Sequence, residues 1–148
     1  MILPKVPRPS KADETTAYEL ATLRDNATCQ MCKKPGEVQR DHRQNRQGGN
    51  TVVENLQCLC PSCHLYKGEH PRWAIDMGWA VPRWADPLVF PARRSVHGVF
   101  EWVQYDNIGG WKVITDEQAK AARSGDENPH IFLSEMKKEA KNDVASVV

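Results

Sequence analysis

Two pairs of closely spaced cysteines constrain the folding of this chain more than any other feature. Cys29 and Cys32 form one pair, and Cys60 and Cys63 form the other. Two residues separate the members of such a pair, so the sulfurs converge at a tight turn, and four thiolates together match the tetrahedral ligand set of zinc. Disulfides or buried thiols are the alternatives, but we expect no secretory signal and hence no oxidising compartment. The four cysteines are therefore predicted to bind a structural Zn²⁺ that joins two segments.

A set of polar residues lies between and beside these pairs. The set comprises Asp41-His42, Gly48-Gly49-Asn50, Asn55, His64 directly after Cys63, and Lys67. With these residues in this order, the segment from Cys29 to Lys67 resembles the HNH endonucleases, also called the ββα-metal fold, in their zinc-containing version. The resemblance implies an α+β fold with a small ββα-metal core stapled by the zinc site. It also implies a metal-dependent DNA endonuclease or nickase that hydrolyses phosphodiester bonds.

The chemistry of such a hydrolysis gives each polar residue a reason to be present. An activated water must attack phosphorus while a cation stabilises the charge that develops there. Neutral imidazole titrates near working pH, so His42 is a candidate general base. Asp41 is its neighbour on an apparently extended segment, where successive side chains point to opposite faces, so the two residues cannot do the same job. The resemblance implies that Asp41 and His64 hold a divalent ion while His42 polarises the water.

The resemblance gives Asn55 a structural role, in which it ties down the loop that carries the base. It also shows one departure, because some family members have a further histidine one helical turn after the position of His64, where this chain has Gly68. An ion with fewer protein ligands keeps more water, which favours Mg²⁺ or Mn²⁺. His70 is a substitute ligand only if the helix bends after Gly68. The main competing interpretation is a centre that keeps the zinc and has lost the second ion.

Charge is balanced over the whole chain and positive near the candidate site. The 148 residues carry a formal net charge of +1, so composition alone does not indicate a nucleic-acid-binding protein. The candidate contacts to double-stranded DNA are Arg40, Arg43, Arg46 and Lys67. For each of them the alternative is a cation that only solvates a loop. The sequence has no apolar run long enough to span a membrane, and we expect a cytoplasmic location in a bacterial or phage-infected cell.

The sequence divides into four predicted parts. Residues 1–12 form a proline-rich flexible arm, and residues 13–70 form the HNH core with a preceding helix, capped by Ser10 or by Asp13 and Glu14 and ended near Asn26. Residues 71–124 form a tryptophan-rich extension: a short helix stopped at Gly78, a proline-interrupted stretch that cannot be a central strand, and a β-hairpin from Val96 to Ile114. Residues 125–148 form a linker and a terminal helix that can dock, fray or mediate self-association.

All five tryptophans follow the HNH-like segment. Aromatic rings can stack on unpaired bases or wedge between base pairs, but in a small extension they more often supply the core. The extension also resembles the tail of a group of phage and actinobacterial HNH proteins, which implies a phage or actinobacterial setting. Two other functions stay open at this stage. One is a zinc-stapled module that binds nucleic acid or protein without catalysis, and the other is a nuclease that cleaves RNA.

Overall fold

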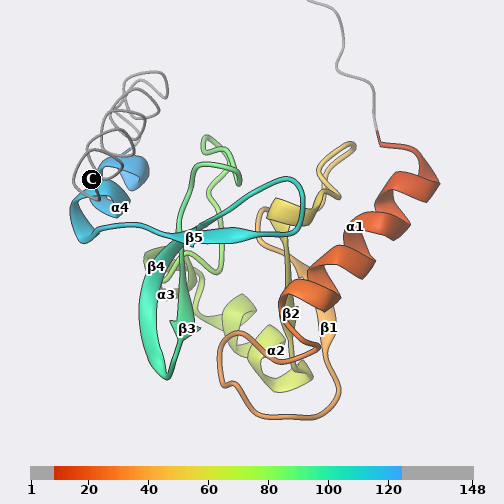
Figure 1. Cartoon of the computed structure of the whole chain (residues 1–148), viewed down its shortest axis with the longest axis horizontal. Coiled ribbons are helices and arrows are strands. Elements are labelled where there is room, and N and C mark those ends of the chain that lie inside the picture. Colours follow the sequence, from red (N-terminus) through yellow and green to blue (C-terminus); the bar gives the residue numbers. More distant parts are fainter. Residues whose placement is uncertain (1–8, 125–148) are drawn as a thin grey trace, which may run out of the picture.

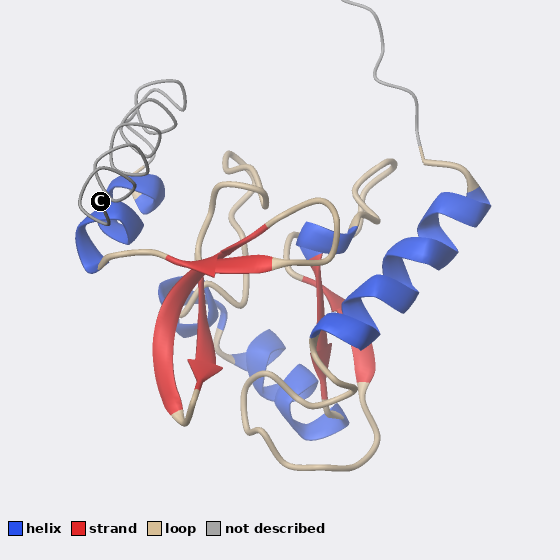
Figure 2. Cartoon of the chain, in the orientation of Figure 1, coloured by secondary structure: helices blue, strands red, loops and turns tan. Residues whose placement is uncertain are grey.

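The computed structural model describes residues 9–124, which form two small sheets with helices around them (Figure 1). This arrangement confirms the predicted α+β class, and Figure 2 distinguishes the helices from the strands by colour. The elements are α1 (Lys11–Arg24), β1 (Gln39–His42), the short 3₁₀ helix η1 (Val53–Asn55), β2 (Leu56–Leu59), α2 (Pro61–Glu69), α3 (Pro71–Asp76), β3 (Ala92–Val96), β4 (Val99–Tyr105), β5 (Trp111–Val113) and α4 (Asp116–Arg123). No helix in this part of the chain is both long enough and apolar enough to cross a membrane.

The candidate site is built on an antiparallel pair of strands followed by a helix. β1 and β2 pair so that Asp41 lies opposite Gln57 and His42 lies opposite Leu56. α2 follows β2 directly because Pro61 suits the first helical turn, where no backbone donor is needed, and Cys60 caps the helix by accepting from the backbone N–H of Cys63. This β1–β2–α2 unit is the ββα arrangement that the resemblance implied.

α1 packs across the β1–β2 pair and begins earlier than predicted. Ser10 caps it in a reciprocal capping box with Asp13, as one of the two predicted caps, so the helix starts at Lys11 and the predicted arm of residues 1–12 is too long. The buried side chains of Ala17 and Ala21 contact Val53 and Leu56. The small alanines let the helix approach the strand closely, which places α1 over the zinc-stapled unit as expected.

The extension is a three-stranded antiparallel sheet in the order β3-β4-β5, where a single hairpin had been predicted. The predicted alternation along β4 is confirmed, because Val103 and Tyr105 pack inward against Ala92, whereas Trp102 packs on the other face with Ile114 and Ala119. β3 was missed because its two central residues are arginines, which do not have the apolar alternation of a half-buried strand.

Two further features of the extension bear on the predicted parts. α3 ends just before Gly78, which was predicted to stop it and which has φ +75°; a Cβ there would lie 2.0 Å from the carbonyl oxygen of Pro91, so only glycine fits. α4 was not predicted, although Thr115 caps it in a capping box with Gln118. The predicted linker, terminal helix and self-association over residues 125–148 lie outside the described residues.

A buried ionic network joins the extension to the HNH-like segment. The Asp25 carboxylate accepts from Arg24 Nε at 2.9 Å, from Arg94 Nη1 at 2.6 Å and from the backbone N–H of Cys58 at 3.0 Å. Arg24 also donates to the carbonyl of Leu56 at 2.6 Å, and its guanidinium lies 4.0 Å above the Tyr105 ring. Burial raises the pKa of Asp25, but the two arginines outweigh it and leave the pKa below its ordinary value. One carboxylate therefore holds α1, β2 and β3 together.

We expect the Asp25→Asn substitution to destabilise the protein by about 3–5 kcal/mol, because it leaves two buried guanidinium groups without their anion. The side chains of Asp25 and Arg24 are 0% and 1% exposed, so solvent cannot compensate. Chemical denaturation monitored by tryptophan fluorescence measures the loss. The matched control is Asp76→Asn, which removes a 76% exposed carboxylate from its ion pair with Arg123 and should cost less than about 1 kcal/mol. Equal losses in the two variants would contradict a stabilising role for the network.

Candidate active site

The four cysteines of the two pairs converge at one point. Their sulfur atoms all lie within 4.8 Å of one another, and Cys32 Sγ lies 3.8 Å from Cys60 Sγ. A tetrahedron with zinc–sulfur bonds of about 2.3 Å has edges of about 3.8 Å, so the spacing fits a Zn²⁺ ion. All five cysteines are free, and the fifth, Cys58, is fully buried away from the cluster, next to the carbonyl of Ala21. The cluster is a structural zinc-type metal site, as the spacing predicted.

The electrostatics of the cluster fit the same ion. Burial raises the pKa of Cys29, but backbone N–H groups of Cys32, Cys60 and Met31 outweigh it and bring that pKa down to about 7. Burial and the three neighbouring thiols raise the pKa of Cys63 well above its ordinary value. Four thiolates this close repel one another unless a cation lies between them, so metal binding has to release the remaining protons.

Asp41 and His64 lie side by side at the junction of β1 and α2. Asp41 Oδ1 is 3.3 Å from His64 Nε2, and His64 Nδ1 is 2.7 Å from Gln39 Oε1. An Nδ1–H that donates to Gln39 leaves Nε2 as an acceptor, and this acceptor faces a carboxylate oxygen. Two facing acceptors need a cation or a proton between them. Adjacent ligands of an octahedral Mg²⁺ ion lie about 3.0 Å apart, so the spacing of the two atoms is compatible with two ligands of one such ion.

The second oxygen of Asp41 is held by two further residues. Lys67 Nζ lies 2.6 Å and Gln57 Nε2 lies 3.0 Å from Asp41 Oδ2. Lys67 Nζ also donates to the carbonyl oxygen of His42 at 2.9 Å, and its side chain is only 11% exposed. Burial lowers the pKa of Lys67, against the opposing effect of Asp41. Lys67 was predicted to contact nucleic acid; in this structure its ammonium group is bonded to the Asp41 carboxylate and to the carbonyl of His42.

His42 projects from β1 on the face opposite to Asp41. Its Nε2 atom is 2.9 Å from Thr51 Oγ1, and its ring meets that of Tyr18 edge to face, with centroids 6.3 Å apart. Burial lowers the pKa of His42, and the charges of Arg46 and Lys67 lower it further against the opposing charge of Asp41. The imidazole is therefore neutral near pH 7, which is the form that a general base requires.

Asn55 is the last residue of η1, directly before β2, and is fully buried. Its Oδ1 accepts from the backbone N–H of Gln44 at 2.7 Å, and its Nδ2 donates to the carbonyls of Gln44 at 3.1 Å and Asn50 at 3.0 Å. All of these partners belong to the loop that follows His42. The contacts are those of a residue that ties this loop to β2, and none of them reaches Asp41 or His64.

The predicted cationic contacts divide into two groups. Arg40 and Arg46 are exposed. Arg43 is 1% exposed, and its guanidinium donates to the carbonyls of Glu54, Gly78, Pro87 and Phe90. Burial lowers the pKa of Arg43 to about 10, so it stays charged while these carbonyls replace its water. The prediction of Arg43 as a nucleic-acid contact was wrong, because none of its donors is free for a phosphate.

The alternative ligand His70 lies away from the Asp41–His64 pair. α2 ends at Glu69, and the His70 ring stacks on Tyr66 with centroids 3.9 Å apart while Nδ1 lies 3.0 Å from the Tyr66 carbonyl. Three side chains that the sequence analysis missed do touch the site: Gln39, Thr51 and Gln57. Gln57 could have been found from the strand register, because a residue paired with Asp41 shares its face. Gln39 could have been found from strand alternation, because it lies two residues before Asp41 on β1 and shares its face. Thr51 carries no signal of this kind.

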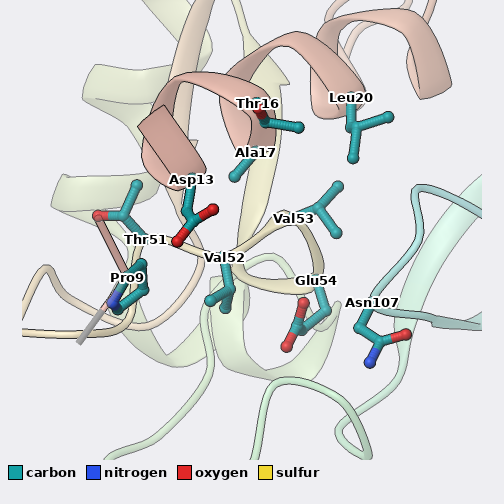
Figure 3. Close-up of a pocket in the computed structure, with 10 residues that line it drawn as sticks. All are labelled: Pro9, Asp13, Thr16, Ala17, Leu20, Thr51, Val52, Val53, Glu54 and Asn107. Carbon is teal, nitrogen blue, oxygen red and sulfur yellow. The ribbon is translucent and has the colours of Figure 1, made fainter. Parts of the chain in front are cut away.

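A pocket of about 460 Å³ is lined in part by Thr51. Asp41, His64 and Lys67 do not line it. α1 and the segment of residues 51–54 form its walls, with the carboxylates of Asp13 and Glu54 at its rim (Figure 3). Burial raises the pKa of Glu54, and its Oε2 has no hydrogen-bond partner. A pocket with two carboxylic acids does not suit a polyanion, so it is not the place where a phosphodiester would bind.

Comparison with known families agrees with this geometry. Residues 29–70 match the model of the HNH endonuclease family. The match spans both cysteine pairs, β1, β2 and the whole of α2, so this segment is an HNH domain with a four-cysteine, zinc-type site. An HNH domain indicates a nuclease. No curated protein and no solved structure matches the chain.

Proposed function

We propose that the protein is a metal-dependent DNA endonuclease or nickase with His42 as its general base and one divalent ion at Asp41 and His64. The observation that carries the proposal is the facing pair of acceptors, Asp41 Oδ1 and His64 Nε2, at 3.3 Å. Lys67 is hydrogen-bonded to the other carboxylate oxygen, which leaves Oδ1 to share an ion or a proton with His64.

His42 would start the reaction by removing a proton from water. In the tautomer whose Nε2–H donates to Thr51 Oγ1, the lone pair on Nδ1 is free to accept that proton. The hydroxide oxygen forms a bond to phosphorus, the bond from phosphorus to the leaving oxygen breaks, and the leaving oxygen takes up a proton. The hydrogen bond to Thr51 holds the His42 ring and Asn55 fixes the loop behind it, so the base is oriented before substrate arrives.

Asp41 and His64 would hold the ion, with Mg²⁺ or Mn²⁺ favoured because the protein offers only these two ligands and water can supply the others. Such an ion supplies charge stabilisation to the transition state and the leaving oxygen. Lys67 and Gln57 keep Asp41 Oδ2 fixed, so that Oδ1 points at His64. The exposed Arg40 and Arg46 are the cations we propose as contacts to the phosphates of duplex DNA.

A second candidate function is supported by one specific observation. The ammonium of Lys67 lies 2.6 Å from Asp41, where it already neutralises the carboxylate. A zinc-stapled module that binds nucleic acid without cleaving it would keep such a pair and have no use for a second ion. Binding of Mn²⁺, followed by its electron paramagnetic resonance signal, separates the two functions: the nuclease binds one Mn²⁺ that Asp41→Asn abolishes, and the module binds none.

Cleavage of supercoiled plasmid with added Mg²⁺ or Mn²⁺ tests the proposed activity directly. Nicked or linear product that requires the added ion supports it, and intact plasmid under all conditions contradicts it. RNA has the same phosphodiester, so a single-stranded RNA and a DNA of the same sequence are compared in parallel. Faster cleavage of the RNA would replace the proposed substrate without changing the proposed chemistry.

The pH dependence of cleavage should report on His42. Because burial and nearby cations place its pKa below the ordinary 6.5, we expect the rate to stay level on acidification to that pH and to fall only as the pH passes the lowered pKa. Arg46→Ala removes one of the charges that lower this pKa, so the acid limb should move to higher pH. Single-turnover rates at saturating DNA and low salt, recorded over a range of pH, give the acid limb of the parent protein and of Arg46→Ala. A limb that moves to lower pH in the variant would contradict the assignment.

A further inference from the structure

We propose that an exposed row of aromatic rings next to the site binds an unpaired nucleic-acid strand. This inference rests on the proposed function and names the form of substrate that the nuclease would hold. The aromatic row is defined by Tyr66, His70, Trp73, Trp79 and Phe100. It begins on α2, the helix that also carries His64 and Lys67, crosses α3 and ends on β4 (Figure 1).

The rings of the aromatic row form an unbroken series of contacts. Tyr66 stacks on His70 with centroids 3.9 Å apart, and Trp73 meets the Tyr66 ring edge to face at 5.0 Å. Trp73 in turn contacts Trp79 at 5.2 Å, and Trp79 contacts Phe100 at 6.1 Å. Trp79 is fixed in place because its Nε1–H donates to the carbonyl of Arg93 at 3.0 Å. The row is therefore a rigid surface held on a buried tryptophan.

Most of the aromatic row is exposed, although aromatic side chains ordinarily fill the core of a small extension. Trp79 alone is buried, at 3% exposed, whereas Tyr66 is 43%, Phe100 39% and Trp73 36% exposed. Leu65, beside Tyr66 on α2, is 65% exposed. Large apolar groups that are adjacent on a surface indicate a binding site, because their contact with water is energetically unfavourable.

Cations border the far end of the aromatic row. The guanidinium groups of Arg93 and Arg123 lie 4.2 Å and 4.9 Å from the centre of the Trp102 ring, and Lys120 lines the same depression of about 630 Å³. Arg93 also donates to the carbonyl of Phe100, so this end is continuous with the row. Asp116 lies in the depression and Asp76 lies 3.6 Å from Arg123, so three cations face two carboxylates. Aromatic rings can stack on the bases of a strand, and the neighbouring positive charges can bind its phosphate backbone.

An unpaired strand fits the aromatic row better than a duplex does. In a duplex the base faces are stacked on one another and only their edges are accessible, so exposed ring faces gain little from it. An unpaired base offers a whole face to each ring, and such stacking does not depend on sequence. We therefore infer a substrate with a single-stranded segment beside the cleavage site, such as a flap, a branch or a gapped duplex.

The test measures binding separately from cleavage. Fluorescence anisotropy of a labelled oligothymidine strand and of a labelled duplex of the same length is recorded with the His42→Ala protein, which retains its zinc. We expect Tyr66→Ala and Trp73→Ala, made in that protein, each to weaken binding of the single strand by about tenfold and to leave duplex binding unchanged. Trp73→Phe preserves a ring and should retain most of the affinity. Trp84→Ala is the matched control, because Trp84 is 62% exposed and contacts Phe90 outside the row.

Single-strand binding that is unchanged in Tyr66→Ala and Trp73→Ala would overturn the proposal, and so would an equal loss of duplex binding or a protein that does not bind the single strand at all. Tyr66 alone decides the matter if Trp73→Ala fails to fold, as judged by circular dichroism and zinc content. Plasmid cleavage by the same substitutions in the parent protein keeps the two proposals apart. A nuclease with an inert aromatic row still cuts, and a protein that binds single strands but never cuts contradicts only the proposed function.

Discussion

Replacement of Cys63 by serine is expected to abolish zinc binding and the cooperative thermal unfolding transition. A structural zinc site of this kind contributes apparent binding free energy of about 10–16 kcal/mol, which exceeds or equals the whole stability of an ordinary domain. The sulfurs of Cys29, Cys32, Cys60 and Cys63 are within 4.8 Å of one another. The loss of one ligand therefore leaves three cysteines crowded together without the cation that neutralises their thiolates. Elemental analysis of the purified protein and scanning calorimetry measure the two effects.

Cys58→Ala is the matched control for this experiment. Cys58 is as buried as Cys29, but its sulfur belongs to the apolar packing against α1 and not to the metal site. We expect this variant to bind one zinc per chain. Its free energy of unfolding should fall by no more than about 2 kcal/mol, the cost of a small cavity. If Cys63→Ser kept its zinc while Cys58→Ala lost it, the ligand set would be wrong.

The substitution His42→Ala is expected to lower the rate of plasmid cleavage by about 10²–10⁴-fold, which is the usual contribution of a general base. Zinc content and unfolding temperature should stay close to those of the parent protein, because the imidazole is half-buried and its one side-chain hydrogen bond is to Thr51. Rates of conversion of supercoiled to nicked plasmid at saturating Mg²⁺ measure the loss.

A histidine far from the site provides the comparison for this substitution. His97 is exposed in the turn between β3 and β4, so His97→Ala should cleave at the parental rate. Thr51→Val should have an intermediate effect, since it removes only the hydroxyl that holds the His42 ring. Cleavage by His42→Ala at the parental rate would assign the proton transfer to another group, and the proposed mechanism would have to be abandoned.

The sequence allowed prediction of those features that depend on local spacing. The zinc ligands are fixed by two-residue gaps, the faces of β4 by strict alternation, and the end of α3 by Gly78. The adjacency of Asp41 and His64 followed from the motif order, and the structure places them 3.3 Å apart. The role of each residue in chemistry is a separate matter and stays a proposal.

Features that depend on distant backbone could not be predicted in the same way. Arg40, Arg43 and Arg46 look equivalent in the sequence, yet Arg43 alone is enclosed by carbonyls from residues 54, 78, 87 and 90. Lys67 looked like one more surface cation until α2 was packed against β1, which brings its ammonium to Asp41. β3 could not be recognised because one of its buried side chains is that of Arg94. The charge of Arg94 is neutralised by Asp25, which lies 69 residues earlier in the chain.

The buried arginines bear on how such a module can evolve. Arg43 belongs to the HNH-like segment but donates to three carbonyls of the extension, and Arg94 belongs to the extension but pairs with Asp25 at the end of α1. Removal of the extension would leave Arg43 without the carbonyls of Gly78, Pro87 and Phe90 and would leave Asp25 without Arg94. A recombination event that moves residues 29–70 alone into another gene would therefore have to supply substitutes for these three carbonyls.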